Sequence, residues 1–204
     1  MLVAGLVGPA GAGKSEVLRV LSELGAECLR ADDASRELLA SDMRLLTEIR
    51  GQLGAAVFGP DGRLDRKRAA ELVFRDASAR ARLEHILHPP MVAWLRERLD
   101  DLRQLAAPPA VAVIETAILT HMGARPLVDC VVRVDAPRLV CQQRLQARDN
   151  VSPQGVGALL DTHEGLGLFD EPADYVVNGA GSLEQTHEEA RALWKWLRER
   201  AGAS

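Results

Sequence analysis

Residues 8–15 read GPAGAGKS, which fits the phosphate-binding pattern G-x-x-x-x-G-K-[ST] without a mismatch. Its glycines allow backbone conformations that a β-carbon would oppose, so that amide N–H groups can turn toward phosphate oxygens. Lys14 would supply a point charge for the β- and γ-phosphates, and the Ser15 hydroxyl a ligand for Mg²⁺. The stretch predicts a loop that holds a nucleoside triphosphate; the alternative is a glycine-rich turn without a ligand.

Carboxylates follow two of the expected strands, at the edge where doubly wound sheets bind their ligands. Asp32 comes after the strand 27–29 and could accept a proton from an attacking hydroxyl group. The alternative is that Asp32 or Asp33 caps the next helix. Glu115 ends the strand 110–114, where it could bind Mg²⁺ or its water ligands, or be an ordinary strand-end charge.

Arg144 and Arg148 are four residues apart in CQQRLQARDN and share one face of a helix. They could clamp a transferring phosphoryl group; the alternative is a solvated basic face with Asp149 as partner. Taken together, the loop, the acid and the arginines predict phosphoryl transfer to a small molecule. The predicted nucleotide-binding residues are Gly8, Ala10, Gly11, Ala12, Gly13, Lys14, Ser15, Glu16, Arg144 and Arg148. The predicted catalytic residues are Asp32, Lys14 and Arg144, and the predicted metal ligands are Ser15 and Glu115.

Short apolar segments alternate with helical patterns along most of the chain. This alternation predicts an α/β fold with a doubly wound parallel sheet of the P-loop NTPase type and helices on both faces. Five strands are expected, at 2–7, 27–29, 110–114, 130–134 and 175–177. A helix is expected after the phosphate loop at 16–24, and an amphipathic helix at 183–200.

Two stretches interrupt the alternation. Residues 42–105 are largely helical in pattern, with a turn at 59–62, and predict an inserted helical lobe followed by a return helix. Residues 148–172 are polar and contain four glycines, which indicates a mobile cover followed by a loop. With the helix before it, this cover forms a predicted lid at about 144–170. No Ser/Gly linker separates these parts, so one domain is expected over 1–204.

The composition excludes several classes of protein. Hydrophobic residues make up 47% of the 204 residues and charged residues 26%, which excludes a disordered chain, a collagen and a coiled-coil rod. A net charge of −4 does not suit a general nucleic-acid binder. Cys28, Cys130 and Cys141 are too far apart for a disulfide framework or a zinc site, which favours the cytoplasm. No apolar run approaches the roughly 18 residues that span a bilayer.

Several further segments resemble those of the dephospho-CoA kinase family over nearly the whole chain. The matching segments are GPAGAGKS at 8–15, ADDASREL at 31–38, VFGPDGRLDRKRAAELVF at 57–74, LEHILHP at 83–89, VVRVDAP at 131–137, QQRLQARD at 142–149 and ADYVV at 173–177. The middle segments are the most specific, because many kinases have a phosphate loop whereas few have FG-x-DG-x-LDR followed by LE-x-I-x-HP.

The resemblance implies ATP-dependent phosphorylation of the ribose 3′-hydroxyl of dephospho-CoA, the last step of coenzyme A synthesis, with ATP and Mg²⁺. It implies that Asp32 is the base, that Lys14 and Ser15 contact ATP and Mg²⁺, and that the two arginines belong to the lid. The helical insertion would bind the acceptor. The predicted acceptor-binding residues are Asp32, Arg36, His88 and His121. We expect small-molecule substrates, no nucleic-acid or membrane partner, and a monomer or weak homo-oligomer.

Several places depart from the usual pattern of that family, among them Val7-Gly8-Pro9 in place of its Thr-Gly-Gly and, at about Phe169, the loss of a basic residue. Arg30 stands where the family has an acid, His163 where it has Gln, Gly179 where it has Asn, and residues 117–121 replace its Pro-Leu-Leu-Phe-Glu block. Two alternatives therefore stay open. One is a divergent paralogue that phosphorylates another nucleoside-like or pantetheine-like hydroxyl. The other is a nucleotide-binding module with little catalysis, in which ATP controls contact with a partner.

Overall fold

The structure is a computed structural model of the chain. It describes residues 1–149 and 153–202, apart from the side chains of Phe74, Arg148 and Asp149. The chain divides into two compact units, the first made of Met1–Arg30 with Arg98–Ser204 and the second of Ala31–Glu97. Among the described residues, no helix combines the length and the hydrophobicity needed to span a bilayer.

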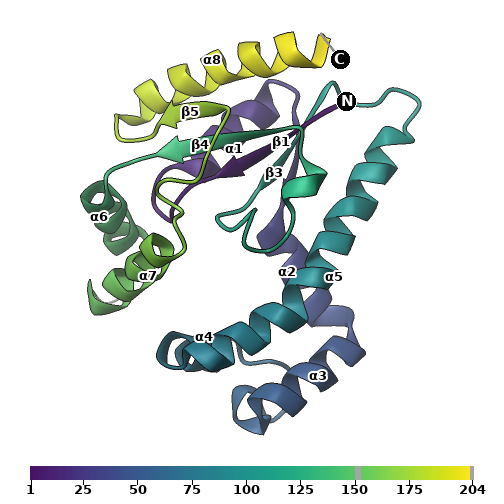
Figure 1. The fold of residues 1–204 in the computed structure, drawn as a ribbon, viewed down its shortest axis with the longest axis vertical. Helices are drawn as coiled ribbons and strands as arrows, with labels where there is room; N and C mark the ends of the chain where they lie inside the picture. The colour runs from purple at the N-terminus through teal and green to yellow at the C-terminus, as the bar shows by residue number, and fades with distance from the viewer. Residues whose placement is uncertain (150–152, 203–204) are drawn as a thin grey trace. The chain divides into compact units, whose positions relative to one another are not determined.

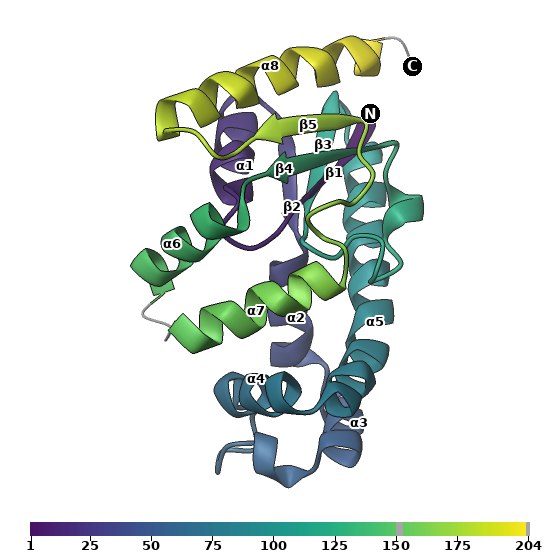
Figure 2. The same ribbon diagram turned by 60° about the vertical axis from the view of Figure 1, so that its left-hand side comes forward.

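The first unit is built on a parallel sheet with the strand order β2-β3-β1-β4-β5 (Figure 1; β2 is labelled in Figure 2). Its strands are β1 (Leu2–Val7), β2 (Glu27–Arg30), β3 (Val111–Glu115), β4 (Cys130–Asp135) and β5 (Tyr175–Asn178). Within the described residues these five strands form one sheet, which confirms the predicted five-stranded parallel sheet. The apolar β1 lies in the middle and is buried along its whole length, so the loop that follows it starts from a fixed point.

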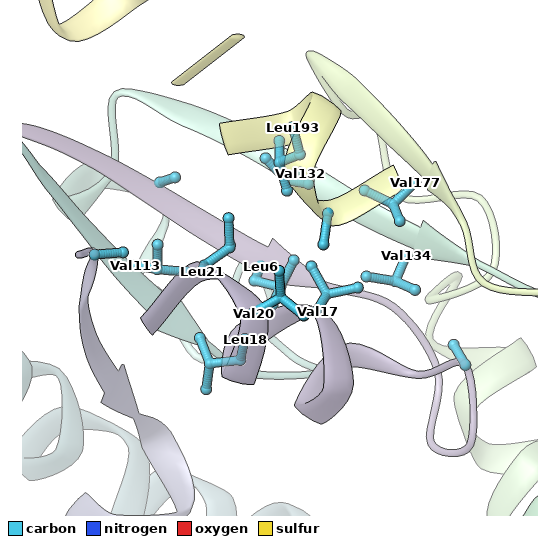
Figure 3. Packing of buried hydrophobic residues seen from close by; sticks show 14 of the residues in the cluster. Leu6, Val17, Leu18, Val20, Leu21, Val113, Val132, Val134, Val177 and Leu193 are labelled. Carbon is cyan, nitrogen blue, oxygen red and sulfur yellow. The ribbon is translucent and has the colours of Figure 1, made fainter. Parts of the chain in front are cut away.

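Helices α1 (Lys14–Glu23) and α8 (Leu183–Gly202) pack against each other and against the sheet. Figure 3 shows the core beneath them, in which Val17 and Leu21 of α1 lie near Leu6 of β1. The opposite face of β1 is covered by the segment between β3 and β4, which includes the short helix η2 (Arg125–Leu127). A β-carbon added at Gly5 would lie 2.6 Å from the Leu119 side chain, so this cover packs directly on the strand.

Helices α6 (Arg138–Asp149) and α7 (Pro153–Gly165) follow β4 and precede β5 in the sequence. The two helices lie side by side (Figure 2). Much of the stretch expected to be a cover and a loop is therefore a regular helix. The helix forms despite its glycines because Val156, Leu160 and His163 recur on one face and are buried. Its function as a lid stays a prediction.

The second unit consists of helices with a core of its own. It contains α2 (Ala31–Ser41), α3 (Met43–Leu53), η1 (Ala55–Val57), α4 (Arg66–Arg75) and most of α5 (Ala77–Arg103). Its buried core residues are Leu45, Ile49, Val57, Phe58, Ala69 and Ile86. Asp42 and Asp65 cap α3 and α4 by accepting hydrogen bonds from backbone amides of the first turn. The unit starts at Ala31 and ends at Glu97, and it overlaps the inserted lobe expected at 42–105.

Candidate active site

The phosphate loop, residues 8–15, connects β1 to α1 and has the backbone conformation that its glycines allow. Gly8, Gly11 and Gly13 have φ values of +131°, +81° and +111°, a region that L side chains rarely adopt. A β-carbon on Gly8 would lie 2.4 Å from the carbonyl oxygen of Val134 in β4. The loop is therefore fixed both by its backbone geometry and by close contact with a neighbouring strand.

Helix α1 presents its N-terminus to the loop without a side-chain cap. Its N-cap residue is Gly13, whose carbonyl accepts hydrogen bonds from the amides of Glu16 and Val17 at 3.0 and 3.2 Å. The first amides of a helix have no acceptor within the helix, and the helix dipole places partial positive charge there. This end of α1 is therefore suited to bind an anion such as a phosphate group.

Lys14 brings a full positive charge into the loop. The residue is only 9% exposed, and its Nζ donates hydrogen bonds to the carbonyl oxygens of Gly8 at 2.8 Å and Pro9 at 3.0 Å. Phosphate oxygens accept stronger, charge-assisted hydrogen bonds from an ammonium group than carbonyl oxygens do. The loop therefore holds a buried cation whose best acceptors would come from a phosphorylated ligand.

A histidine of α7 contacts the same loop. The amide of Ala10 donates to Nδ1 of His163 at 3.1 Å. Burial, together with the charge of Lys14, lowers the pKa of His163 to about 4, so its ring is neutral near pH 7 and carries its proton on Nε2. Nothing in the sequence pattern connects His163 with the loop. The only signal for its burial was its helical spacing from Val156 and Leu160.

Arg144 of α6 also lies against the phosphate loop. Its Nη1 donates to the carbonyl of Gly179 at 2.6 Å and its Nη2 to that of Gly181 at 3.0 Å, both in the turn between β5 and α8. Nη1 also lies 3.3 and 3.4 Å from two carbonyl oxygens of the loop. The guanidinium thus connects the loop to that turn. Arg148 belongs to the same helix, but its side chain lies outside the described residues.

The two predicted metal ligands meet around a third side chain. Arg30 at the end of β2 is in register with Glu115 at the end of β3. Its Nε donates to Oε2 of Glu115 at 3.0 Å, and its Nη2 lies 3.4 Å from Oγ of Ser15. A hydroxyl and a carboxylate are oxygen ligands of the kind that Mg²⁺ prefers, and a cationic group already lies between them. The residues present therefore fit a divalent cation.

Two other predicted residues of this unit have their own surroundings. The Glu16 side chain turns toward α8, where its Oε1 accepts from Arg19 at 2.8 Å and lies 3.0 Å from His187 Nε2. Hydrogen bonds from these two groups lower the pKa of Glu16. His121 is exposed and follows Thr120, whose hydroxyl donates to Glu171 at 2.6 Å. The roles of Glu16 and His121 stay predictions.

The remaining predicted residues belong to the second unit. Asp32 lies in the first turn of α2 and is exposed. Within the part of the chain that the structure describes, its carboxylate has no hydrogen-bond partner, whereas Asp33 accepts from Arg36 Nη1 at 2.7 Å. Both carboxylates lie inside the first turn rather than before it, where they interact favourably with the helix dipole. His88 is half-buried in α5.

The second unit also contains a cavity of about 700 Å³ that the sequence analysis did not identify. Its lining residues are Arg36, Leu39, Ala40, Met43, Leu46, Thr47, Arg50, Phe58, Asp61, Gly62, Arg63, Leu64 and Arg66. Four arginines and one aspartate give it a positive balance over an apolar floor. The Arg50 guanidinium lies 4.2 Å from the centre of the Phe58 ring. The cavity suits an anionic ligand that has an apolar part.

The sequence was compared with known families and proteins. The model of the dephospho-CoA kinase family matches residues 2–184. A dephospho-CoA kinase of Moorella thermoacetica is 37% identical over 197 residues, which cover 97% of this chain and 92% of that protein. A dephospho-CoA kinase of Syntrophotalea carbinolica is 36% identical over 193 residues, which cover 95% of this chain and 90% of that protein.

Solved structures share the fold of this chain over nearly its whole length. A crystal structure of a Thermus thermophilus protein is 28% identical, with a TM-score of 0.75 and coverage of 96% of this chain and 97% of the other. The dephospho-CoA kinase of Campylobacter jejuni has the same fold, with a TM-score of 0.67 at 20% identity and 97% coverage of both chains. The family model and the relatives together show that this chain belongs to the dephospho-CoA kinase family.

Proposed function

We propose that this chain transfers the γ-phosphoryl group of ATP to the ribose 3′-hydroxyl of dephospho-CoA, which completes coenzyme A. The observation that carries the proposal is the phosphate loop. Glycines with positive φ, a buried Lys14 and the uncapped N-terminus of α1 together form an anion-binding cradle. The choice of dephospho-CoA as the acceptor rests on membership of the family, because the relatives are dephospho-CoA kinases.

In the proposed reaction, Asp32 accepts the proton of the 3′-hydroxyl as that oxygen attacks the γ-phosphorus. The bond between the γ-phosphorus and the β–γ bridging oxygen breaks, and ADP leaves. Lys14 stabilises the charge that develops on the phosphate oxygens. Ser15 and Glu115 would hold Mg²⁺, directly or through water, and the ion would neutralise part of the same charge.

The arginines of α6 are proposed to act in a lid over about 144–170. Arg144 already lies at the loop, where it could exchange backbone carbonyl oxygens for phosphate oxygens, which are stronger acceptors. Arg148 would contact the same phosphoryl group. A lid that closes over the substrates would exclude water and so limit hydrolysis of ATP.

The second unit is proposed to bind the acceptor within a single kinase domain. Its cavity offers arginines for the phosphate groups of dephospho-CoA and an apolar floor for the pantetheine arm. Arg36 lines the cavity, and His88 and His121 are proposed as further acceptor contacts. We further propose a cytoplasmic enzyme that acts as a monomer or a weak homo-oligomer.

One observation favours a second candidate acceptor. Arg30 brings a cation to the end of β2, beside the predicted metal ligands. The family pattern has an acid at this position, so the local charge is reversed in this chain, and a reversed charge favours a different substrate. The second candidate is therefore phosphorylation of another nucleoside-like or pantetheine-like hydroxyl.

The test is phosphoryl transfer by the purified protein. ATP, Mg²⁺ and dephospho-CoA should give coenzyme A, identified by its mass, together with an equal amount of ADP. Coenzyme A itself is the matched control, because its 3′-hydroxyl is already phosphorylated and it should not stimulate release of ADP. Product from another hydroxyl compound but not from dephospho-CoA would favour the second candidate. Binding of ATP without transfer to any acceptor would contradict both.

A further inference from the structure

The guanidinium of Arg30 lies between the two residues that are predicted to bind a divalent cation, Ser15 and Glu115. It contacts Oε2 of Glu115 at 3.0 Å and Oγ of Ser15 at 3.4 Å. The Glu115 side chain is only 11% exposed, whereas that of Arg30 is 44% exposed. A largely buried carboxylate is thus neutralised by a cation that reaches it from the surface.

The pairing follows from the sheet. Arg30 and Glu115 are the last residues of two adjacent parallel strands and are partners in the register of those strands. Their side chains therefore leave the sheet at the same edge, where α1 presents Ser15 in its first turn. A carboxylate of this burial needs a positive partner, and Arg30 supplies one as part of the fold.

We propose that Arg30 is a built-in counter-ion that a divalent cation must displace when the metal–nucleotide complex binds. The inference rests on the proposed function, in that it assumes a nucleotide in the phosphate loop. Arg30 is thereby a positioning residue that sets how much Mg²⁺ this chain requires.

Competition follows from space and charge. Mg²⁺ holds its oxygen ligands at about 2.0–2.1 Å, so a metal shared by Ser15 and Glu115 would need the space that the guanidinium fills. Two cations at one carboxylate oxygen also repel each other. Arg30 has a flexible side chain with access to solvent, so it can leave without rearrangement of the strands. The displaced pair is partly exposed and correspondingly weak, which predicts an effect of about 3- to 10-fold.

The test measures binding of ADP, which avoids turnover, by calorimetry across a titration of Mg²⁺. Arg30→Gln removes the charge and should lower the half-saturating Mg²⁺ concentration by about 3- to 10-fold. Affinity for ADP without metal should not rise, because the variant has lost a positive charge near the phosphates. Arg30→Lys keeps the charge but loses the second contact of the guanidinium group. Its half-saturating Mg²⁺ concentration should lie between those of the wild type and Arg30→Gln.

Two controls make the test specific. Arg103→Gln removes a surface arginine that pairs with Asp100 at 2.8 Å, and it should leave the Mg²⁺ dependence unchanged. In a Glu115→Gln background, Arg30→Gln should have no further effect on the Mg²⁺ midpoint, because the shared carboxylate is gone. Titration with Mn²⁺, followed by electron paramagnetic resonance, should show the same order of variants through the metal itself.

An unchanged or higher Mg²⁺ requirement in Arg30→Gln would overturn the proposal, since Arg30 would then be neutral toward the metal or assist it. The outcome is separable from that of the proposed function. If the wild-type protein bound no nucleotide at any Mg²⁺ concentration, the nucleotide site itself would be wrong. If it bound nucleotide and Arg30→Gln did not alter the metal dependence, the role of Arg30 alone would be wrong.

Discussion

The phosphate loop of the first unit and the arginine-lined cavity of the second are built from different materials. The loop is formed by backbone amides, glycines with positive φ and one lysine that is 9% exposed. The cavity is formed by side chains of α2, α3 and α4 and of the segment before α4, and four of these side chains are arginines. A backbone cradle recognises what all nucleotides share, the phosphates, whereas a surface of side chains can be changed residue by residue to select an acceptor. The difference predicts distinct responses to mutation.

The largest effect is expected from the residue proposed to act on the acceptor hydroxyl. Asp32→Asn should lower kcat by about 10²- to 10⁴-fold, the range for loss of a general base. Its affinity for ATP should stay nearly unchanged, because the phosphate loop is intact. Steady-state kinetics and a binding titration check both expectations. Equal turnover in the variant would remove Asp32 from the role of base.

The next effect belongs to the loop. Lys14→Ala should weaken binding of ATP by about 10- to 100-fold, the equivalent of a lost charge-assisted hydrogen bond to phosphate. Binding of dephospho-CoA alone should change little if the acceptor is held by the second unit. Calorimetry with each ligand separates the two effects. Lys195→Ala, at an exposed position of α8, is the matched control.

A separate effect, on stability rather than on binding, should appear in the pH dependence of unfolding. The pKa of His163 in the folded state is about 4, below its usual value of 6.5, so the unfolded chain takes up the proton first as the pH falls. The neutral His163 therefore supports the folded state fully above about pH 6.5. As the pH falls toward 4, the free energy of unfolding decreases by up to about 3 kcal/mol. His163→Gln keeps a hydrogen-bond acceptor but does not titrate, so it should flatten this slope.

Urea unfolding between about pH 4 and pH 7 measures that slope. The exposed Gln154 of α7 offers a control, because Gln154→Asn changes no titratable group and should leave the pH dependence as it is in the wild type. A slope that His163→Gln does not change would show that the contact between α7 and the loop does not depend on the neutral imidazole.

The smallest effect is expected in the cavity of the second unit, because four arginines line it and the loss of one leaves three positive charges. Arg50→Gln should raise the KM for dephospho-CoA by about 3- to 10-fold with little change in the KM for ATP, as for the loss of one polar contact. Arg68→Gln, on the exposed part of α4 and outside the cavity, is the control. An increase confined to the KM for ATP would place the acceptor elsewhere.

The sequence predicted best those parts of the site that depend on local backbone chemistry. The bounds of β1 match the apolar run that stops before Gly8, and the backbone conformation of the loop follows from the spacing of its glycines. Helix α1 begins at Lys14, two residues before the helix expected at 16–24, because its first turn belongs to the loop rather than to the core. Its buried residues Val17 and Leu21 have the predicted helical spacing.

Contacts between distant segments could not be predicted in this way. The pair of Arg30 and Glu115 depends on the register of two strands, which the sequence does not specify. The contact of His163 with Ala10 spans 153 residues and depends on the packing of α7. The sequence predicts a cover and a loop where α7 forms, because glycines and polar residues are more prominent there than the spacing of the three buried side chains.

Gly8 and Gly11 of the phosphate loop, and Gly179 in the turn that packs against it, leave no room even for a methyl group. Added β-carbons would lie 2.4 Å from a carbonyl oxygen at Gly8, 2.6 Å at Gly11 and 2.2 Å at Gly179. The backbones of β4, of α6 and of the turn after β5 therefore pack directly against the loop. An alanine at any of these three positions would push two main chains apart, and no rotamer could relieve the clash. The shape of the cradle therefore depends on atoms that these three residues lack.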